Sequence, residues 1–250
     1  MSDMKAVFMI FILTFLAPTS IAKTIWHWEN SNYLFSLTEK DFLILNKESK
    51  KIIFSAQRNA LNIKQKDCKV NYVFQPRSFL NGVFSYFEEA YVTGNTEGCS
   101  GPSGYSYSIG IKNVDLKNLK EVSINKFFND ATILQKLKAD TYIRKIAQDE
   151  KFSVSVKDMD LFFPLFADRN ISKCDEVISE RLRFSYFFDH SEGSNIAVRF
   201  AMSYLCGAPS DNNSIPKQIG VLLPFKLIPN TYFFYRDIKT VLGKGIEINI

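Results

Sequence analysis

Residues 24–56 read TIWHWENSNYLFSLTEKDFLILNKESKKIIFSA, and this stretch indicates the type of fold. Runs rich in aromatic and β-branched residues alternate in it with short polar runs, which is typical of antiparallel strands joined by tight turns. The sequence therefore predicts four strands in this stretch, at residues 24–29, 33–38, 41–46 and 51–56.

The first of these strands carries two tryptophans. Trp26 and Trp28 would share one face of the strand, with His27 on the other face, because side chains alternate along a strand. We interpret the two indoles as a cover for the core; alternatively, they would bind sugar rings or a partner.

Further strands are expected on both sides of one helical block. Ser123 is a good N-cap for a short helix, and Asp130 would cap a longer one, so that residues 123–150 form a helical hairpin. Because the strands are grouped around this block and do not alternate with helices, the sequence predicts an α+β fold with mainly antiparallel sheets. The expected strands are 69–74, 83–92, 105–111, 181–188, 196–205, 218–227 and 232–236, with a hairpin turn at 189–195.

The N-terminus resembles a secretory signal peptide. Residues 6–17 are apolar, Lys5 precedes them, and the small residues Ser20 and Ala22 stand where signal peptidase requires them. We expect cleavage after Ala22, which would leave residues 23–250 as a mature α+β domain in the bacterial periplasm or outside the cell. This domain could contain two units, 23–122 and 151–250, around the helical block, and it has no second apolar run that would insert stably into a membrane.

Four cysteines lie in the exported part of the chain. An even number in an oxidising compartment favours two disulfides, and the spacing favours the pairs Cys68–Cys99 and Cys174–Cys206. A reactive thiol or a zinc site is the alternative. Cys99 and Cys206 each open a C-x-x-P-S phrase that is followed by an Ile-Gly-aliphatic triplet, which would fit an internal duplication.

The composition argues against several classes of function. Lysine and arginine total 31 and aspartate and glutamate total 26, and this small excess is scattered, so we expect no nucleic-acid partner. The chain has only two histidines, and we expect no metal site, no cofactor and no catalytic residue. Glu88 and Glu89 would point to opposite faces of a strand, so they cannot act as one carboxylate pair.

The glycine-rich stretch 93–104 is too long for a simple hairpin turn, and long loops in compact domains often carry function. Tyr105 and Tyr107 would share one face of the strand that follows the loop. We therefore predict a partner-binding site at Asn95, Gly101, Ser103, Tyr105 and Tyr107; the alternative is that both tyrosines pack in the core.

Residues 84–150 show a characteristic order of elements: the strand FSYFEEAYV, a glycine-rich loop, the strand YSYSI, the turn Asp115-Leu116-Lys117, and then a short helix before a longer one. This order resembles an extracytoplasmic domain found in lysozyme-sensing anti-sigma factors and beside peptidoglycan deacetylases. The Gly-Gly-Ala-His loop usual in that family is replaced here by a cysteine followed by Ser-Gly-Pro-Ser-Gly.

The function expected from these observations is that of an exported binding protein, with no enzymatic activity assigned. Its sharpest form is a protective inhibitor or immunity-type protein that blocks an envelope-attacking hydrolase or toxin. The alternatives are a peptidoglycan-related envelope enzyme or accessory domain, and a carbohydrate-binding module. The sequence indicates no oligomeric state.

Overall fold

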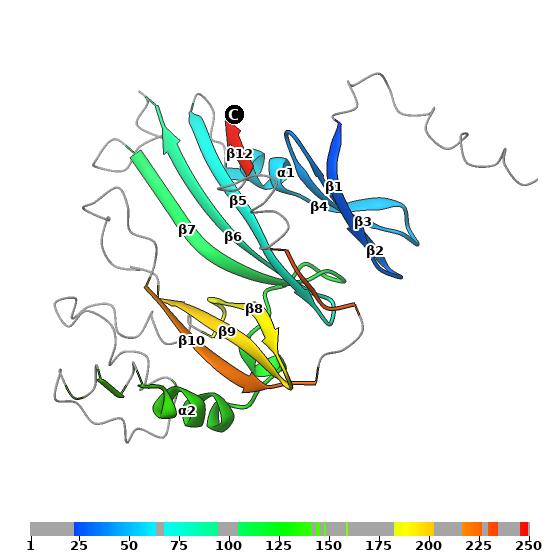
Figure 1. The fold of residues 1–250 in the computed structure, drawn as a ribbon. Helices are drawn as coiled ribbons and strands as arrows, with labels where there is room; N and C mark the ends of the chain where they lie inside the picture. The colour runs from blue at the N-terminus through cyan, green and yellow to red at the C-terminus, as the bar shows by residue number, and fades with distance from the viewer. Residues whose placement is uncertain are drawn as a thin grey trace, which may run out of the picture.

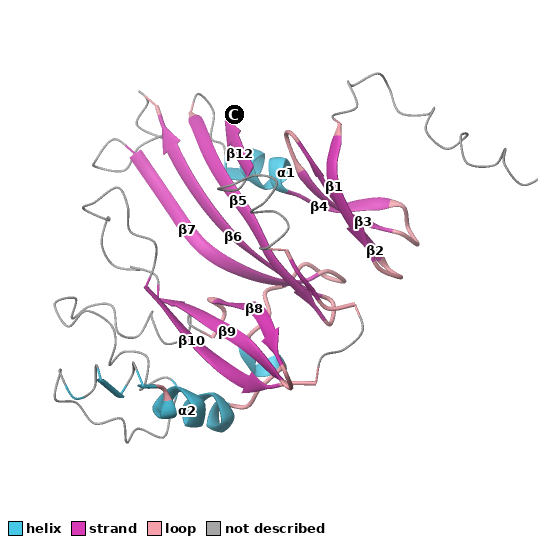
Figure 2. Ribbon diagram, viewed as in Figure 1, coloured by secondary structure: helices cyan, strands magenta, loops and turns pink. Residues whose placement is uncertain are grey.

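The computed structural model describes residues 23–63, 68–94, 105–141, 144–145, 148, 159, 183–202, 217–226, 230–234 and 246–249. Within these residues the chain forms three antiparallel sheets, two α-helices and one 3-10 helix (Figures 1 and 2). The predicted mainly antiparallel α+β architecture is confirmed.

The N-terminal stretch forms a four-stranded sheet in the order β1-β2-β3-β4. Its strands are β1 (Thr24–Glu29), β2 (Tyr33–Thr38), β3 (Phe42–Asn46) and β4 (Lys51–Ser55), close to the predicted bounds. A helix that was not predicted, α1 (Ala56–Ile63), follows β4 directly. Ser55 begins it, because the Ser55 hydroxyl accepts a hydrogen bond from the backbone N–H of Arg58 at 3.0 Å.

A five-stranded sheet with three long strands forms the middle of the molecule (Figure 1). Asn81 and Gly82 join β5 to β6 in a two-residue turn with φ of 49° and 78°, the left-handed values that such hairpin turns require. The order is β11-β5-β6-β7, and β12 pairs with β5 at residues 71–74. The strands are β5 (Lys69–Leu80), β6 (Val83–Thr93), β7 (Tyr105–Asp115), β11 (Tyr232–Phe233) and β12 (Ile246–Asn249).

The first hydrophobic core lies between these two sheets and is dominated by aromatic rings. Phe84 of β6 stacks on Phe42 of β3 with ring centroids 5.6 Å apart and planes within 5°. Trp28 stacks on Tyr232 at 4.5 Å, and Trp26 meets the edge of Phe234 at 5.7 Å. Both tryptophans are partly buried against this core, so the interpretation of the indoles as a core cover is confirmed.

The helical block differs from the predicted hairpin. Ser123 caps a 3-10 turn, η1 (Ile124–Lys126), as expected, but the N-cap of α2 (Asp130–Ala139) is Asn129 and not Asp130. The Asn129 side chain accepts a hydrogen bond from the N–H of Thr132 at 2.8 Å, which makes Asp130 the first helical residue. Helix α2 ends at Ala139, with Asp140 as its C-cap, and residues 141–150 are described only in part.

A three-stranded sheet in the order β10-β9-β8 packs on α2 and encloses a second core. The predicted hairpin between β8 and β9 is confirmed, with a shorter turn at Gly193 and Ser194 than expected. Leu134, Leu137, Phe188, Val198 and Leu223 are buried in this core. The strands are β8 (Tyr186–Glu192), β9 (Asn195–Met202) and β10 (Lys217–Pro224).

A buried amide is one of the links between the five-stranded sheet and this smaller sheet. Asn113 of β7 is 1% exposed, and its Nδ2 donates to the carbonyl oxygens of Phe184 at 2.7 Å and Tyr186 at 2.6 Å. Its Oδ1 accepts a hydrogen bond from the hydroxyl of Ser85 at 2.5 Å. One side chain therefore joins β6, β7 and the start of β8.

Cys68 is buried and takes part in a disulfide. The other three cysteines, Cys99, Cys174 and Cys206, lie outside the described residues. Within the described part of the chain, no helix has the length and apolar character needed to cross a membrane.

Candidate functional site

The five-stranded sheet has one face in the first core and an opposite face, which we call the outer face. Along β6, Ala90 and Val92 are buried in the core at 2% and 6% exposure, whereas Tyr91 between them is 37% exposed. Because side chains alternate along a strand, Tyr91 belongs to the outer face.

The register of β7 aligns the two predicted tyrosines with this face. Tyr107 pairs with Tyr91, and Tyr105 pairs with Thr93. Residues directly opposite in an antiparallel pair occupy the same face of the sheet. The backbone positions of Tyr105 and Tyr107 therefore belong to the outer face and not to the face that forms the first core.

Polar groups continue the outer face across the neighbouring strands. Tyr91 pairs with Asn71 of β5, which pairs with Asn249 of β12, so that one row across the sheet contains these residues and Tyr107. The next row contains Glu89 and Glu247, with Val73 between them. The Tyr91 hydroxyl donates to Glu89 Oε1 at 2.8 Å. The arrangement combines aromatic area with amide and carboxylate groups, which suits a polar docking surface.

Glu88 lies on the core side, opposite in direction to Glu89. Tyr72 donates its hydroxyl to Glu88 Oε2 at 2.8 Å. Burial raises the pKa of Glu88, against the opposing effects of this hydrogen bond and of Lys112. Burial, followed by the nearby Glu88 charge, also raises the pKa of Tyr72. The prediction that Glu88 and Glu89 cannot form one carboxylate pair is confirmed.

The far end of the outer face is covered by the three-stranded sheet. Phe187 of β8 packs with Ile111 and the partly buried Phe87. The guanidinium of Arg77 lies 5.1 Å from the ring centroid of Phe187 and 6.0 Å from that of Phe87, within cation–π distance. The outer face is thus closed near residues 85–87 and carries its exposed tyrosine, Tyr91, toward the other end.

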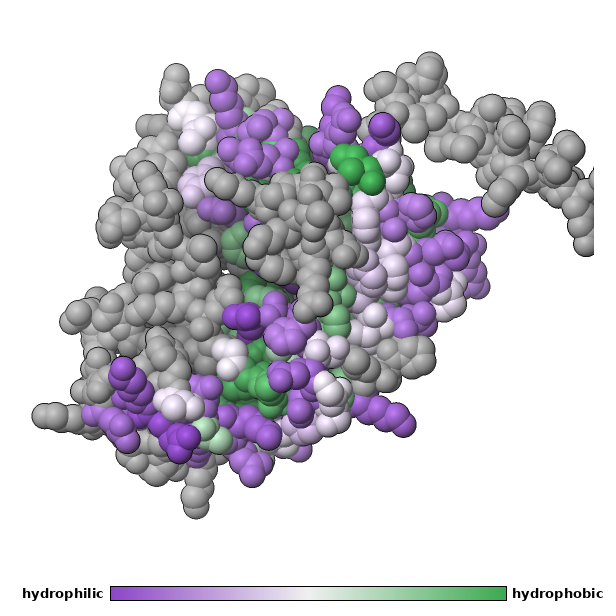
Figure 3. All heavy atoms as spheres, viewed as in Figure 1, coloured by the Kyte–Doolittle hydropathy of each residue, from purple (hydrophilic) through white to green (hydrophobic). Residues whose placement is uncertain are grey.

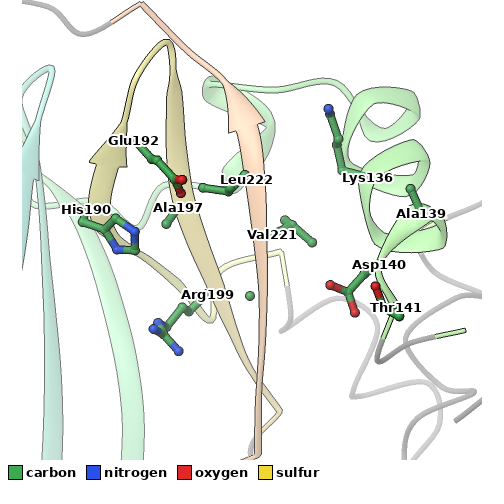
Figure 4. Close-up of a pocket in the computed structure, with 11 residues that line it drawn as sticks. Lys136, Ala139, Asp140, Thr141, His190, Glu192, Ala197, Arg199, Val221 and Leu222 are labelled. Carbon is green, nitrogen blue, oxygen red and sulfur yellow. The ribbon is translucent and has the colours of Figure 1, made fainter. Parts of the chain in front are cut away.

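A second group of polar side chains lies on the three-stranded sheet. Arg199 donates from Nε and Nη2 to Asp189 Oδ2, both at 2.9 Å, and His190 Nδ1 lies 3.1 Å from the same oxygen. A hollow of about 630 Å³ adjoins this group on both sides of β10. Figure 4 shows His190, Glu192, Arg199 and Leu222 on one side of the strand, with Lys136 and Asp140 on the side of α2.

The predicted site residues are only partly described. Tyr105 and Tyr107 lie on one face, as expected, whereas Asn95, Gly101 and Ser103 lie outside the described residues. Tyr91 was not predicted as a site residue, although its alternation with Ala90 and Val92 was a usable signal. The residues around Asp189 were assigned to a turn. The sequence did not reveal the pairing of Asp189 with Arg199, because the two residues are ten positions apart and meet only through the β8–β9 register.

No set of three or more histidine, cysteine or carboxylate side chains suited to a metal ion occurs among the described residues. Neither a protein-family model, nor a curated protein, nor a solved structure matches the chain.

Proposed function

We propose that this chain is an exported, non-enzymatic binding protein that blocks an envelope-attacking hydrolase or toxin. Its partner docks on the outer face of the five-stranded sheet at Tyr91, Tyr105 and Tyr107. The observation that carries this proposal is the β6–β7 register, which pairs Tyr107 with the exposed Tyr91 on the face away from the first core.

Tyrosine suits this role because it combines a large, rigid apolar area with a polar tip. Residues of this type at the centre of an interface each contribute about 2 kcal/mol or more on truncation, equivalent to roughly 30-fold in affinity. Three tyrosine positions within two neighbouring strands would supply such a centre, and the residues of the loop 93–104 would form its border.

The disulfides are part of this proposal. We assign them to Cys68–Cys99 and Cys174–Cys206. A bridge from Cys68, which is buried next to the start of β5, to Cys99 would tether the loop and reduce the entropy lost on binding. Peptide mapping without reduction tests both pairs, and an intact mass that starts at Lys23 tests export with cleavage after Ala22.

The decisive experiment measures protection of purified peptidoglycan by residues 23–250 against a panel of muramidases, amidases and peptidases. We expect at least one enzyme to be inhibited. The double variant Tyr105→Ala/Tyr107→Ala should weaken that inhibition about 100-fold or more, because two interface anchors are lost together.

A matched control is Phe184→Ala, which removes an aromatic side chain that is 36% exposed and belongs to the segment before β8, not to the five-stranded sheet. This variant should inhibit as well as the parent. The proposal is wrong if no enzyme of the panel is inhibited, or if the folded double variant inhibits as well as Phe184→Ala. Circular dichroism establishes that each variant is folded.

A further inference from the structure

The β9–β10 part of the three-stranded sheet has an exposed face, opposite to the core that the sheet forms with α2. The β8 end of this face is closed, because Phe187, which pairs with Arg199, is 2% exposed and packs on Ile111. The register aligns three rows on this face: Arg199 with Gly220, then His190 with Ala197 and Leu222, then Glu192 with Asn195. The alternate residues Val198 and Leu223 are buried on the α2 side. Hydrophobic residues are visible at the surface over this sheet in Figure 3, and Leu222 is 38% exposed.

One end of the face carries fixed cationic hydrogen-bond donors. Asp189 Oδ2 accepts hydrogen bonds from Nε and Nη2 of Arg199 and lies 3.1 Å from Nδ1 of His190. This arrangement neutralises Asp189 and fixes the guanidinium in place, while the N–H groups of Nη1 are not used in the contact with Asp189. The Arg199 side chain is 43% exposed, so these donors are accessible to a ligand.

The other end of the face carries a carboxylate. Glu192 is exposed, and no ion pair to it occurs within the described part of the chain. Its row is four residues along β9 from Arg199, which corresponds to about 13 Å at the rise of a β-strand. Arg199 and Glu192 both line the hollow of about 630 Å³, which also extends past the edge strand β10 to Lys136 and Asp140 beside α2.

The middle row of the face is recessed at Ala197, whose small side chain stands between those of His190 and Leu222. Ala197 lies between the two charged ends, and Gly220 has no side chain at the Arg199 row. A Cβ atom added to Gly220 would meet the Cγ of Arg199 at 3.8 Å, so the glycine leaves room beside the arginine stem. Leu222 adds an apolar wall.

From this juxtaposition we infer that the face binds a short zwitterionic peptide, with its carboxylate at Arg199 and its amino group at Glu192. This site is distinct from the proposed partner-binding face. A free amino acid cannot occupy both ends, because its two charged groups are attached to one carbon atom. An extended peptide of four residues spans up to about 13–14 Å, which matches the separation of the two rows.

The probe for this site is tetra-alanine, compared with N-acetyl-tetra-alanine and tetra-alanine amide. Titrations followed by amide resonances, including that of Gly220, should show saturable shifts with tetra-alanine. Each capped peptide loses one charge-assisted contact and should bind about tenfold more weakly. These comparisons use the unmodified protein, so they do not depend on the folding of any variant.

Variants then assign each end. Glu192→Gln should remove the preference for tetra-alanine over its N-acetyl form and keep the preference over the amide; Arg199→Lys should weaken binding of the free carboxylate. Glu48→Gln and Arg58→Gln, exposed residues elsewhere in the chain, serve as matched controls and should change nothing. Equal affinities for the three peptides, or no saturable shift up to about 10 mM, would refute the inference.

Discussion

At the scale of single residues, Asn113 shows how a buried polar group can join two parts of a fold. Its Nδ2 donates hydrogen bonds to one carbonyl oxygen before β8 and to one within it. Its Oδ1 accepts a hydrogen bond from the hydroxyl of Ser85. Buried polar groups are costly only when they lack partners, so this network stabilises the junction as long as it is complete.

Removal of the Asn113 side chain should therefore destabilise the protein. Asn113→Ala leaves two carbonyl oxygens and one hydroxyl without a buried partner, and we expect the free energy of unfolding to fall by about 3 kcal/mol. Urea denaturation measures this change. Asn71→Ala, an exposed asparagine on β5, is the control and should change stability by less than about 0.5 kcal/mol. Equal effects of the two substitutions would contradict this account of the junction.

Glu88 is the second informative residue, because burial raises its pKa. A carboxyl whose pKa is higher in the folded state contributes stability that is fully present below its unfolded pKa. That stability is lost as the pH rises through the folded pKa. Glu88 should thus make the protein less stable at pH 7 than at low pH.

Glu88→Gln should remove this dependence, since the amide stays neutral and its oxygen can still accept the hydrogen bond from Tyr72. We expect the variant to be more stable than the parent at pH 7 and equal to it at the acidic end of the range. Thermal unfolding from pH 3 to 8 measures the difference. Glu247→Gln, on the exposed side of β12, is the comparison; a stability gain for Glu88→Gln that does not change with pH would contradict the assignment.

At the scale of elements, α2 depends on a side chain that precedes it. Asn129 Oδ1 accepts hydrogen bonds from the N–H of Thr132 at 2.8 Å and from its hydroxyl at 2.9 Å. Arg183 then contacts Asp130 at 3.0 Å and links the first turn of the helix to the segment before β8. The start of α2 is therefore fixed both by its own cap and by a distant residue.

Asn129→Ala should cost about 1 kcal/mol of unfolding free energy, because the first turn loses its cap. Asn129→Ser should restore most of this loss, since serine is also an effective N-cap. Chemical denaturation of the three proteins gives the ranking. If serine were no better than alanine, the loss would come from something other than capping.

At the scale of the whole molecule, two cores of different character hold the described residues together. The first is an aromatic cluster between two sheets, and it also includes Phe234 from the C-terminal part of the chain. Phe84 contacts the rings of Phe42, Phe54 and Phe234 with centroids 5.3–5.8 Å apart. It therefore packs against residues from the beginning and the end of the described chain.

Phe84→Ala should be among the most destabilising single substitutions, with a loss of about 3–5 kcal/mol from lost burial and the cavity that remains. Differential scanning calorimetry would detect it as a large fall in Tm. Phe184→Ala, at a side chain that is 36% exposed, should cost clearly less. A small loss for Phe84→Ala would mean that the two sheets do not depend on this ring.

Local patterning in the sequence predicted much of this molecule. Alternation of apolar and polar residues located β1 to β4 and the β8–β9 hairpin, and it separated Glu88 from Glu89. Ser123 was identified as a cap because capping depends on neighbours within one turn. These features could be predicted because the residues that determine them lie within a few positions of each other in the sequence.

The tertiary structure decided the rest. Helix α1 buries only Ala56 and Ala60, too little apolar pattern to reveal a helix, and β5 continues past Phe74 because β6 pairs with it up to Leu80. The pairing of Tyr107 with Tyr91, the contacts of Asn113 and the position of Arg199 beside Asp189 all depend on strand register. Register is set by the packing of whole sheets, so the sequence determined the elements of this protein and tertiary packing determined which side chains they bring together.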